Sequence, residues 1–483
     1  MFLLDIDLES KEPIYKQIVD QIITMIEEGT LTSGSKLPST RELSLILKLS
    51  RNSCIHAYEE LEAREYISII KGKGAFVSNV QKHLNRGWNI AWKKQCSDYA
   101  KRAVELDIIK SEPVTKKGMI SFKSIAPDEK LFDLEQVRRN FLNGIALEGE
   151  KLLNYGYAKG YRPLIEYLEI YLKDKGICLE GKDILITNGF TEAFDIILAS
   201  ITKPLDSIIC ENPTHNTAIK IIKLHELNIA SVSMENGEIN VEELEKALSS
   251  GNNKLVYLIP SYHNPMGTVM SASKRKEVYE LCKKYNTPIV EDGFNEELLY
   301  SSSHVSSIAA VAGMDNGVIY LGSFSKVLFP GIRVGWIVAD KGLIEVLESV
   351  KRSRNIHTSV LDQMLLYQFL KSGDFELYMK KTRKFYREKY EFSIECSKRY
   401  LPHSRIYGEG GLYIFIELVD IDSRVLLKRA MEKGVIFMPG DIFFVNEKGR
   451  NTFRLGFSRL SLKDIEKGFR IIGKCIEDIK ANK

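Results

Sequence analysis

Short β-branched runs alternate with helical segments over residues 183–326, and this alternation restricts the fold more than any other feature. The runs are DILIT, SIICEN, KLVYLIPSY, TPIVEDGF and GVIYLGSFSK, and amphipathic segments such as TEAFDIILASI and SKRKEVYELCKKYN separate them. Strands joined in this way pair in parallel, with helices on both faces of the sheet. From about Met119 the sequence therefore predicts an α/β domain that binds its ligand at the carboxyl ends of its strands.

Polar residues occur where these runs end, and several of them are suited to a phosphate group. Phosphate binds to backbone amides at a helix N-terminus and to side chains that carry hydroxyl or guanidinium groups. The residues concerned are Gly189, Phe190, Thr191, Ser323, Ser325 and Arg333. Together they predict a site for the phosphate of a small anionic ligand.

Two further residues supply what a pyridine ring bearing an aldehyde needs. Lys326 stands beside the serines, and a lysine amine condenses with an aldehyde to form a Schiff base. Asp292 ends a buried run, and a carboxylate on the ring nitrogen tunes such a ring as an electron sink. The residues predict pyridoxal 5'-phosphate as cofactor, with Lys326 as the catalytic residue.

Residues 119–483 resemble the fold type I aminotransferases. The resemblance rests on NYGYAKGYRPL, ITNGFTEAF, HNPMG, VEDGFNEE, SFSKVLFPGIRVGW and FRLGFS, of which the lysine segment is the most specific. It implies that Lys326 forms the aldimine, that Asp292 binds the pyridine nitrogen and that Asn264 binds the ring 3-oxygen. It also implies that Tyr155 reaches the phosphate of a neighbouring subunit in a homodimer, and that Arg454 binds the α-carboxylate of a substrate.

Two positions depart from that family's pattern. Phe294 stands where members have a tyrosine that donates to the 3-oxygen, and His215, in ENPTHN, stands where an aromatic residue stacks on the ring. Either both residues preserve ring packing and change little, or the absence of that hydrogen bond, worth roughly 1.5–3 kcal/mol, weakens transamination. The sequence leaves both alternatives open.

The first eighty residues predict a small helical DNA-binding domain. PIYKQIVDQIITMIEEG has isoleucines at four-residue spacing and ends at Gly29, which predicts an amphipathic helix. Ser39 and Glu42 in LPSTREL predict a capping box, and Ser50 in LSRNS caps the next helix. Two β-rich runs around KGKG predict a hairpin with lysines at its tip. The pattern is that of a helix-turn-helix followed by a wing.

This stretch resembles the winged helix of the GntR regulators, with IYKQI, LPSTREL, LSRNS, AYEELE and GKGAFV in the same order. A helix-turn-helix places the start of its second helix against base edges, and basic residues elsewhere contact phosphates. The residues expected to contact DNA are Lys36, Ser39, Thr40, Arg41, Arg51, Asn52, Ser53, Lys71 and Lys73.

Charge supports DNA binding only locally. Residues 1–80 contain nine basic and twelve acidic side chains, a net charge of −3, whereas residues 36–77 contain seven and five, a net charge of +2. We therefore expect a modest, salt-sensitive affinity, since log K falls by roughly 0.9 per neutralised phosphate for each decade of salt. Residues 82–118 carry nine basic and four acidic side chains, which indicates either a solvated face or contacts with DNA or with the larger domain.

Composition argues against several other classes of protein. The seven cysteines are scattered without a C-x-x-C pair, which fits a reducing cytosol and disfavours a disulfide scaffold or a zinc site. No apolar run approaches the roughly 18 residues of a membrane helix. The start MFLLDIDLES has acids where a signal peptide has basic residues. We expect a cytoplasmic protein that binds no metal and no membrane.

A winged helix joined to an aminotransferase-like domain resembles the MocR regulators. We expect a GntR-like winged helix over residues 1–80, a linker over 81–118 and a fold type I α/β domain with a mostly parallel sheet over 119–483. A smaller C-terminal α+β subdomain begins at about residue 370. The resemblance implies a transcription regulator that senses an amino compound, or the cofactor itself, through an aldimine at Lys326. The alternative is an active aminotransferase that carries a DNA-binding module.

Overall fold

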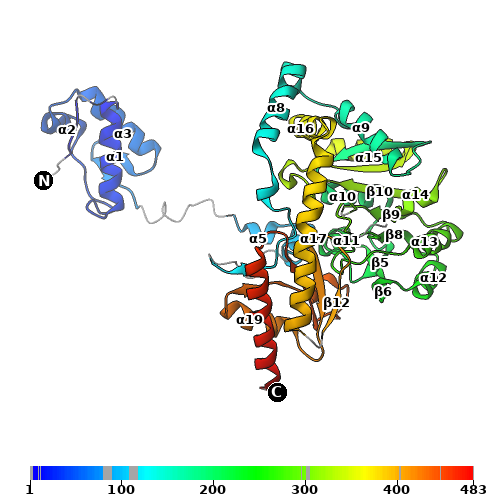
Figure 1. Cartoon of the computed structure of the whole chain (residues 1–483). Coiled ribbons are helices and arrows are strands. Elements are labelled where there is room, and N and C mark those ends of the chain that lie inside the picture. The colour runs from blue at the N-terminus through cyan, green and yellow to red at the C-terminus, as the bar shows by residue number, and fades with distance from the viewer. Residues whose placement is uncertain are drawn as a thin grey trace. The chain divides into compact units, whose positions relative to one another are not determined.

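The computed structural model describes residues 4–8, 10, 12–79, 90–107, 118–294, 296–300, 305–401, 404–446 and 448–481. The chain separates into two compact units, which meet in sequence between Ser97 and Asp98. Blue colours mark the N-terminal unit in Figure 1, and the colours from cyan to red mark the rest of the chain.

Three helices and a hairpin form the N-terminal unit. They are α1 (Ile14–Glu27), α2 (Thr40–Leu47), α3 (Arg51–Ala63), β1 (Ile67–Ile70) and β2 (Gly74–Val77), and the short α5 (Trp92–Gln95) follows. Ser39 Oγ accepts from the Glu42 amide, and the Glu42 carboxylate accepts from the Ser39 amide, so the expected capping box is present. Ser50 caps α3 as expected. The predicted winged helix-turn-helix is confirmed.

The isoleucine spacing of α1 accounts for the packing of this unit. Ile18, Ile22 and Ile26 lie on one side of the helix and pack in one core with Leu43 of α2 and Leu61 of α3. Four-residue spacing places such side chains on a single helical face, and burying that face holds the three helices together.

An eight-stranded sheet forms the centre of the C-terminal unit, in the order β4-β11-β10-β9-β8-β5-β6-β7. Its strands are β4 (Lys182–Thr187), β5 (Ser207–Asn212), β6 (Asn228–Glu235), β7 (Glu238–Ile239), β8 (Asn253–Leu258), β9 (Ile289–Asp292), β10 (Val318–Ser323) and β11 (Gly335–Asp340). The pairs β5–β6, β5–β8, β8–β9 and β9–β10 are parallel, which confirms the predicted mostly parallel sheet. The strand β11, in GWIVAD, was not predicted, and it pairs antiparallel with both β4 and β10.

Helices cover both faces of this sheet. The described ones are α8 (Leu134–Glu148), α9 (Arg162–Asp174), α10 (Phe190–Ile201), α11 (Asn216–Leu224), α12 (Val241–Ser249), α13 (Ala272–Lys284), α14 (Ile308–Ala312), α15 (Lys341–Arg354) and α16 (Val360–Lys371). Side chains alternate along the strands, so Ile184 and Ile186 face one core with α9, α13 and α16, while Leu185 faces another with α10, α11 and α15. Both faces of the sheet are therefore buried, as in a doubly wound α/β fold.

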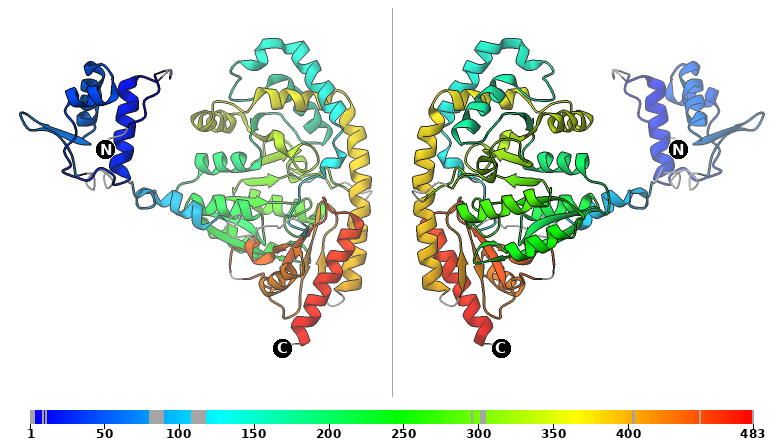
Figure 2. Two further views of the ribbon diagram at one scale, coloured as in Figure 1. Left: turned by 90° about the vertical axis from the view of Figure 1, so that its left-hand side faces the viewer. Right: turned by 90° about the vertical axis from the view of Figure 1, so that its right-hand side faces the viewer.

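A smaller α+β part follows. Its elements are α17 (Asp374–Tyr400), β12 (Arg405–Tyr407), β13 (Tyr413–Glu417), α18 (Ser423–Glu432), β14 (Val435–Ile436), β15 (Met438–Pro439), β16 (Thr452–Gly456) and α19 (Leu462–Ala481), and β3 (Ile120–Ser121) pairs with β14. In both views of Figure 2 the long α17, in yellow to orange, runs beside the red α19, and the two helices pack together. Four short 3-10 turns, η1 (Glu129–Leu131), η2 (Gly149–Leu153), η3 (Pro330–Ile332) and η4 (Gly440–Phe443), complete the described elements.

Helix α6 (Asp98–Glu105) belongs to the segment expected to be a linker, and it packs against α11. Arg102 Nη2 lies 2.7 Å from Glu226 Oε1, and Lys220 Nζ lies 3.7 Å from Asp107 Oδ1. The basic segment was expected either to be solvated or to contact DNA or the larger domain. In α6 it contacts the larger domain. Residues 80–89 and 108–117 of the same segment lie outside the described residues.

The described residues contain neither a membrane-spanning helix nor a metal-binding cluster. Within those ranges, no helix has both the length and the apolar character needed to cross a bilayer. Nor does this part of the chain contain three or more histidine, cysteine, aspartate or glutamate side chains arranged to hold a metal ion.

Candidate cofactor site and nucleic-acid interface

The carboxyl ends of the parallel strands meet at one edge of the large sheet. Asp292 ends β9 and lies beside Leu321 of β10, and Ser323 ends β10 opposite Gly335 of β11. Because β11 runs antiparallel, its first residue, Gly335, also lies opposite Thr187 at the end of β4. This edge therefore gathers the predicted residues from segments far apart in the sequence.

The Lys326 amine is enclosed at this edge and is easily deprotonated. Burial lowers the pKa of Lys326 to about 8, and the positive charges of Arg454 and Arg333 act in the same direction. The nearby Asp292 carboxylate opposes the shift. An amine of this kind is neutral, and hence nucleophilic, in roughly a tenth of molecules at pH 7, far more than for an exposed lysine.

Asp292 is almost fully buried, with 1% of its surface exposed. Burial raises the pKa of its carboxyl to about 7, while hydrogen bonds from the Tyr257 hydroxyl and the Phe294 amide and the charge of Lys326 favour the ionised form. The Tyr257 hydroxyl donates to Asp292 Oδ2 over 2.9 Å. Sequence reasoning missed Tyr257, because nothing in KLVYLIP distinguishes a core tyrosine from one that supports a carboxylate.

Several of the groups predicted to bind phosphate lie at the start of α10. Gly189 precedes the helix with φ of 79°, a conformation that favours glycine, and Phe190 and Thr191 begin the first turn. Arg333 Nη2 donates to the Asn188 carbonyl over 3.1 Å. A Cβ at position 189 would lie 2.6 Å from Arg333 Nη2, so glycine permits this approach of the guanidinium to the helix start.

Ser323 and Ser325 lie on the adjacent strand end. Their hydroxyl oxygens are 2.8 Å apart, and the Ser325 amide donates to Ser323 Oγ over 3.1 Å. A Cβ at Gly335 would lie 2.9 Å from Gly189 Cα, so this glycine brings the strand against the start of α10. Backbone amides, two hydroxyls and one guanidinium are thus collected at one corner.

Asn264 and Arg454 form a buried pair close enough to Lys326 for the Arg454 charge to act on its amine. Arg454 Nη1 donates to Asn264 Oδ1 over 2.8 Å, and the guanidinium packs over the rings of Phe443 and Tyr413. Burial lowers the pKa of Arg454 to about 10, so the group remains charged at neutral pH. Asn264 Nδ2 and Arg454 Nε are buried and have no hydrogen-bond partner.

The two residues that depart from the family pattern face each other. The rings of His215 and Phe294 are nearly parallel, at 12°, with centroids 6.3 Å apart. Burial, with the positive charges of Lys326 and Arg454 as smaller causes, lowers the pKa of His215 to about 3, so its imidazole is neutral. His215 Nδ1 is also buried without a hydrogen-bond partner.

Tyr155 does not join the other residues of this site. Its side chain is 79% exposed, and its ring lies edge-on to that of His357, with centroids 6.1 Å apart. The chain therefore brings together the predicted residues of the lysine, aspartate, asparagine, arginine and glycine segments, and leaves Tyr155 on its surface.

Pyridoxal phosphate fits this set of donors. The unpartnered Asn264 Nδ2, His215 Nδ1 and Arg454 Nε are buried polar atoms of a kind that folded proteins normally satisfy. Asn264 Nδ2 suits a ring oxygen, the Asp292 carboxylate suits a ring nitrogen and Arg454 suits a carboxylate. Lys326 provides the amine for an aldehyde.

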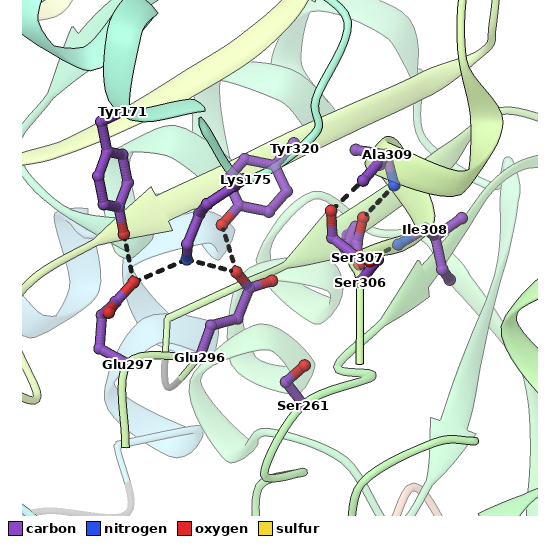
Figure 3. A network of polar contacts seen from close by, with 12 residues as sticks. Tyr171, Lys175, Ser261, Glu296, Glu297, Ser306, Ser307, Ile308, Ala309 and Tyr320 are labelled. Atoms are coloured by element: carbon purple, nitrogen blue, oxygen red, sulfur yellow. Dashed lines mark hydrogen bonds and ion pairs between the residues drawn. The ribbon is translucent and has the colours of Figure 1, made fainter. Parts of the chain in front are cut away.

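A buried ionic network supports the loop that follows Asp292 (Figure 3). Lys175 Nζ lies 2.8 Å from Glu296 Oε2 and 2.7 Å from Glu297 Oε1. The hydroxyl of Tyr171 bonds to Glu297, and that of Tyr320 donates to Glu296 Oε2 over 3.1 Å. The network therefore fixes the residues immediately after the carboxylate that faces the cofactor site.

The N-terminal unit presents the predicted DNA-contacting residues on its surface. Thr40 and Ser53 are half-buried, and the exposed members of the predicted set are Lys36, Ser39, Arg41, Arg51, Asn52, Lys71 and Lys73. Lys36 pairs with Phe76 of the wing through an isolated bridge, so the loop before α2 lies beside the hairpin.

Acidic side chains of this unit are partly neutralised by basic neighbours. Glu60 Oε1 lies 2.6 Å from Arg64 on the same helix, and Glu12 Oε1 lies 3.1 Å from Lys16. Glu27 accepts from the Tyr66 hydroxyl over 2.9 Å. These groups belong to α1, the segment before it and the end of α3, whereas Arg51 lies at the start of α3.

Comparison with protein families divides the chain in the same way. The model of aminotransferase class I and II matches residues 122–472, and that of the bacterial regulatory proteins of the gntR family matches residues 14–77. The members of the first family use pyridoxal phosphate, which agrees with the donors around Lys326.

Individual relatives cover either the C-terminal part or the whole chain. The chain is 30% identical over 374 residues to aromatic-amino-acid aminotransferase 1 of Thermococcus litoralis, and the alignment covers 76% of this chain and 89% of that one. It is 27% identical over 482 residues to the uncharacterised HTH-type transcriptional regulator YdfD of Bacillus subtilis, and here the alignment covers 97% of both.

A solved structure supports the same assignment. LysN, the α-aminoadipate aminotransferase of Thermus thermophilus complexed with N-(5'-phosphopyridoxyl)-L-leucine, superposes with a TM-score of 0.74 at 28% identity, over 82% of this chain and 100% of that one. The chain belongs to the class I and II aminotransferase family and carries a GntR-family domain ahead of it, which is the arrangement of the MocR-type regulators.

Proposed function

We propose that this chain is a transcription regulator that binds DNA through its winged helix and senses an amino compound at a pyridoxal phosphate site built on Lys326. The observation that carries the proposal is that a relative named as an HTH-type transcriptional regulator aligns over 97% of both chains. The alignment therefore includes both the DNA-binding unit and the unit that contains the cofactor site.

In the C-terminal unit, different residues would bind the different functional groups of the cofactor. Arg333 and the two neighbouring serines would bind the phosphate, Asp292 the ring nitrogen and Asn264 the ring 3-oxygen. When bound, pyridoxal phosphate supplies an aldehyde that condenses reversibly with primary amines and a ring that withdraws electrons. Lys326, with a pKa of about 8, would offer it a neutral amine.

Arg454 restricts the class of effector. Its guanidinium is buried beside Asn264, with Nε unpartnered, so a carboxylate is the complementary group. An amine is needed to compete with Lys326 for an aldehyde. The effector we infer is therefore an amino acid or a related compound that carries both groups.

Sensing requires that the effector favours one arrangement of the protein over another. A ligand moves a two-state equilibrium from 1:99 to 99:1 only if it binds the favoured state more tightly by about 5.5 kcal/mol. Interactions of the amine and the carboxylate, made in one arrangement and not in the other, would supply this difference.

A homodimer would complete the site. Tyr155 is exposed, and apolar side chains that are also exposed occur on α8, on η2 and near His357. They are Leu142, Leu147, Leu153, Tyr157 and Ile356. A group of exposed apolar residues of this kind marks a surface that another chain covers, and in a dimer Tyr155 would be placed to reach the partner's phosphate.

An active aminotransferase is the second candidate. Asp292, Asn264 and Arg454 are buried close to the half-buried Lys326, so the groups that such a reaction needs are available. Phe294, which has no hydroxyl, is the residue that argues for weak turnover. Sustained conversion of amino acids on a timescale of seconds would identify the chain as an enzyme.

The decisive experiment joins absorbance, chemical trapping and DNA binding. Purified protein saturated with pyridoxal phosphate should become coloured and, after borohydride reduction, carry the adduct on Lys326 by peptide mass spectrometry. A panel of amino acids should then change both the absorbance and the affinity for operator DNA. In Lys326→Ala the DNA response should be lost, and a protein that stays colourless with no adduct would overturn the proposal.

A further inference from the structure

Helix α11 begins at the cofactor site. Its N-cap is His215, whose ring faces Phe294 and whose imidazole is close enough to Lys326 to respond to its charge. The Thr214 amide just before it donates to the Phe443 carbonyl over 2.8 Å, in the segment whose ring lies under Arg454. The first turn of α11 is therefore attached to both sides of the site.

The same helix is anchored in the core and to a neighbouring helix. Ala218, Ile221 and Ile222 on its inner side are buried in the core beside the sheet. The nine residues of α11 span about 13 Å at 1.5 Å per residue. At its far end His225 Nε2 lies 2.7 Å from Asp195 Oδ1 of α10, the helix that starts at the phosphate corner.

The middle of α11 and the turn that follows it also contact α6 and the residues just after α6. Glu226 binds Arg102 at 2.7 Å and Lys220 faces Asp107 at 3.7 Å, so each partner contributes one charge of each sign. Because the two pairs have opposite polarity, reversing α6 along α11 would bring like charges together. The Arg102 and Glu226 side chains remain 30% and 48% exposed, and exposed ion pairs of this kind are weak.

Helix α6 is the first element of the C-terminal unit, directly after the last residue of the N-terminal unit. Release of α6 would therefore add its residues to the connection between the C-terminal unit and the DNA-binding unit. Within the described residues, α11 begins at the cofactor site and contributes one ion pair to this segment, and the turn that follows α11 contributes the other.

We propose that α11 couples ligand binding to the DNA-binding unit: ligand binding beside His215 changes how tightly Glu226 and Lys220 hold α6. The inference rests on the proposed function, since it assigns a route to the sensing that the function requires. In this proposal α6 docks on the outer side of α11, and the fraction of molecules in which it is docked depends on the ligand.

Hydrogen exchange in the full-length protein tests the docking surface. We expect Arg102→Glu and Glu226→Arg each to accelerate amide exchange in residues 98–107 by roughly twofold to tenfold, and the double variant, which restores opposite charges, to recover most of the protection. Arg64→Glu, which lies in the N-terminal unit, serves as the control. Exchange that is unchanged in both single variants would show that α6 is not held by this pair.

The coupling is tested by adding pyridoxal phosphate and following the same amides. We expect its binding to slow exchange in residues 98–107 and in residues 216–224, and Glu226→Arg, at a residue outside the cofactor site, to remove the response of 98–107 while the bound cofactor still absorbs. Cofactor absorbance without any response in 98–107 would overturn this inference and leave the proposed function intact. A protein that binds no cofactor would instead remove the proposed function.

Discussion

The hydroxyl of Tyr257 donates a 2.9 Å hydrogen bond to Oδ2 of Asp292, in a pocket that excludes water from both side chains. Burial alone raises the pKa of the Asp292 carboxyl, and this hydrogen bond opposes the rise. Tyr257 therefore helps to keep Asp292 ionised at a pH where the carboxylate is needed for a ring nitrogen.

Tyr257→Phe is expected to weaken cofactor binding near neutral pH. Loss of a hydrogen bond to a charged group costs roughly 1.5–3 kcal/mol, which corresponds to a pKa increase of roughly one to two units for Asp292. The affinity for pyridoxal phosphate at pH 7 should fall roughly fivefold to fiftyfold, and raising the pH to 8.5 should restore much of it. Absorbance titration gives both values. Tyr386→Phe, at a buried tyrosine that accepts from the Asp128 amide, is the matched control.

The rate of covalent attachment at Lys326 should depend on pH with a midpoint near 8. Only the neutral amine attacks an aldehyde, and burial lowers the pKa of Lys326 to about 8. The rate should therefore rise about tenfold per unit below pH 8 and level off above it. In Arg454→Met the removal of a positive charge should move the midpoint upward. Stopped-flow absorbance measures this, and a wild-type midpoint near that of an exposed lysine would contradict the assignment.

Arg454→Leu should separate amino acids from simple amines. If the guanidinium binds the effector carboxylate, the affinity for amino acids should fall by about a hundredfold or more, since two charge-assisted bonds are worth about 3 kcal/mol. Alkyl amines of similar size, which carry no carboxylate, should lose far less affinity. Equilibrium titration of the cofactor absorbance reports both, and equal losses for the two classes would exclude Arg454 from carboxylate recognition.

Arg51→Ala and Lys73→Ala should each weaken binding to duplex DNA and make it less dependent on salt. The slope of log K against log salt should become shallower by about 0.9 for each phosphate that the variant no longer neutralises. Fluorescence anisotropy over a series of salt concentrations gives this slope. Arg64→Ala is the control, because Arg64 pairs with Glu60 at 2.6 Å on the same helix. A slope that does not change in either variant would place the DNA-binding surface elsewhere.

Lys175→Met should destabilise the C-terminal unit. Lys175 neutralises Glu296 and Glu297, and removal of one partner from a buried ionic network costs about 3–5 kcal/mol. Denaturant unfolding should show this loss, together with weaker cofactor binding, because the network supports the loop after Asp292 (Figure 3). Lys274→Met removes a pair with Glu277 on the helix surface and should change the stability by less than about 1 kcal/mol.

The sequence predicted those parts of the molecule that depend on local chemistry. The capping box of Ser39 and Glu42 and the β-branched runs that become β5, β8, β9 and β10 are all set by neighbouring residues, and all were predicted. Placement of Lys326 and Asp292 at the ends of adjacent strands follows from parallel pairing, which the helices between the strands indicate.

The remaining features depend on contacts between residues far apart in the chain. Strand β11 pairs with β4 across about 150 intervening residues, and its GWIVAD pattern does not say which strands it will join. The bond of Tyr257 to Asp292 and the docking of α6 on α11 likewise arise from the register of distant elements. Nothing near Tyr257 or Arg102 in the sequence distinguishes them from ordinary core and surface residues.

Because β11 runs antiparallel to its neighbour β10, Lys326 and Arg333 both lie on the connection of a single hairpin. Inserting or deleting one residue in that connection would shift the Lys326 amine relative to the Arg333 guanidinium. Schiff-base formation and phosphate binding would then be impaired together. Length changes among chains of this kind should therefore accumulate in connections that bear neither group, and the interval from 326 to 333 should stay constant as such proteins diverge.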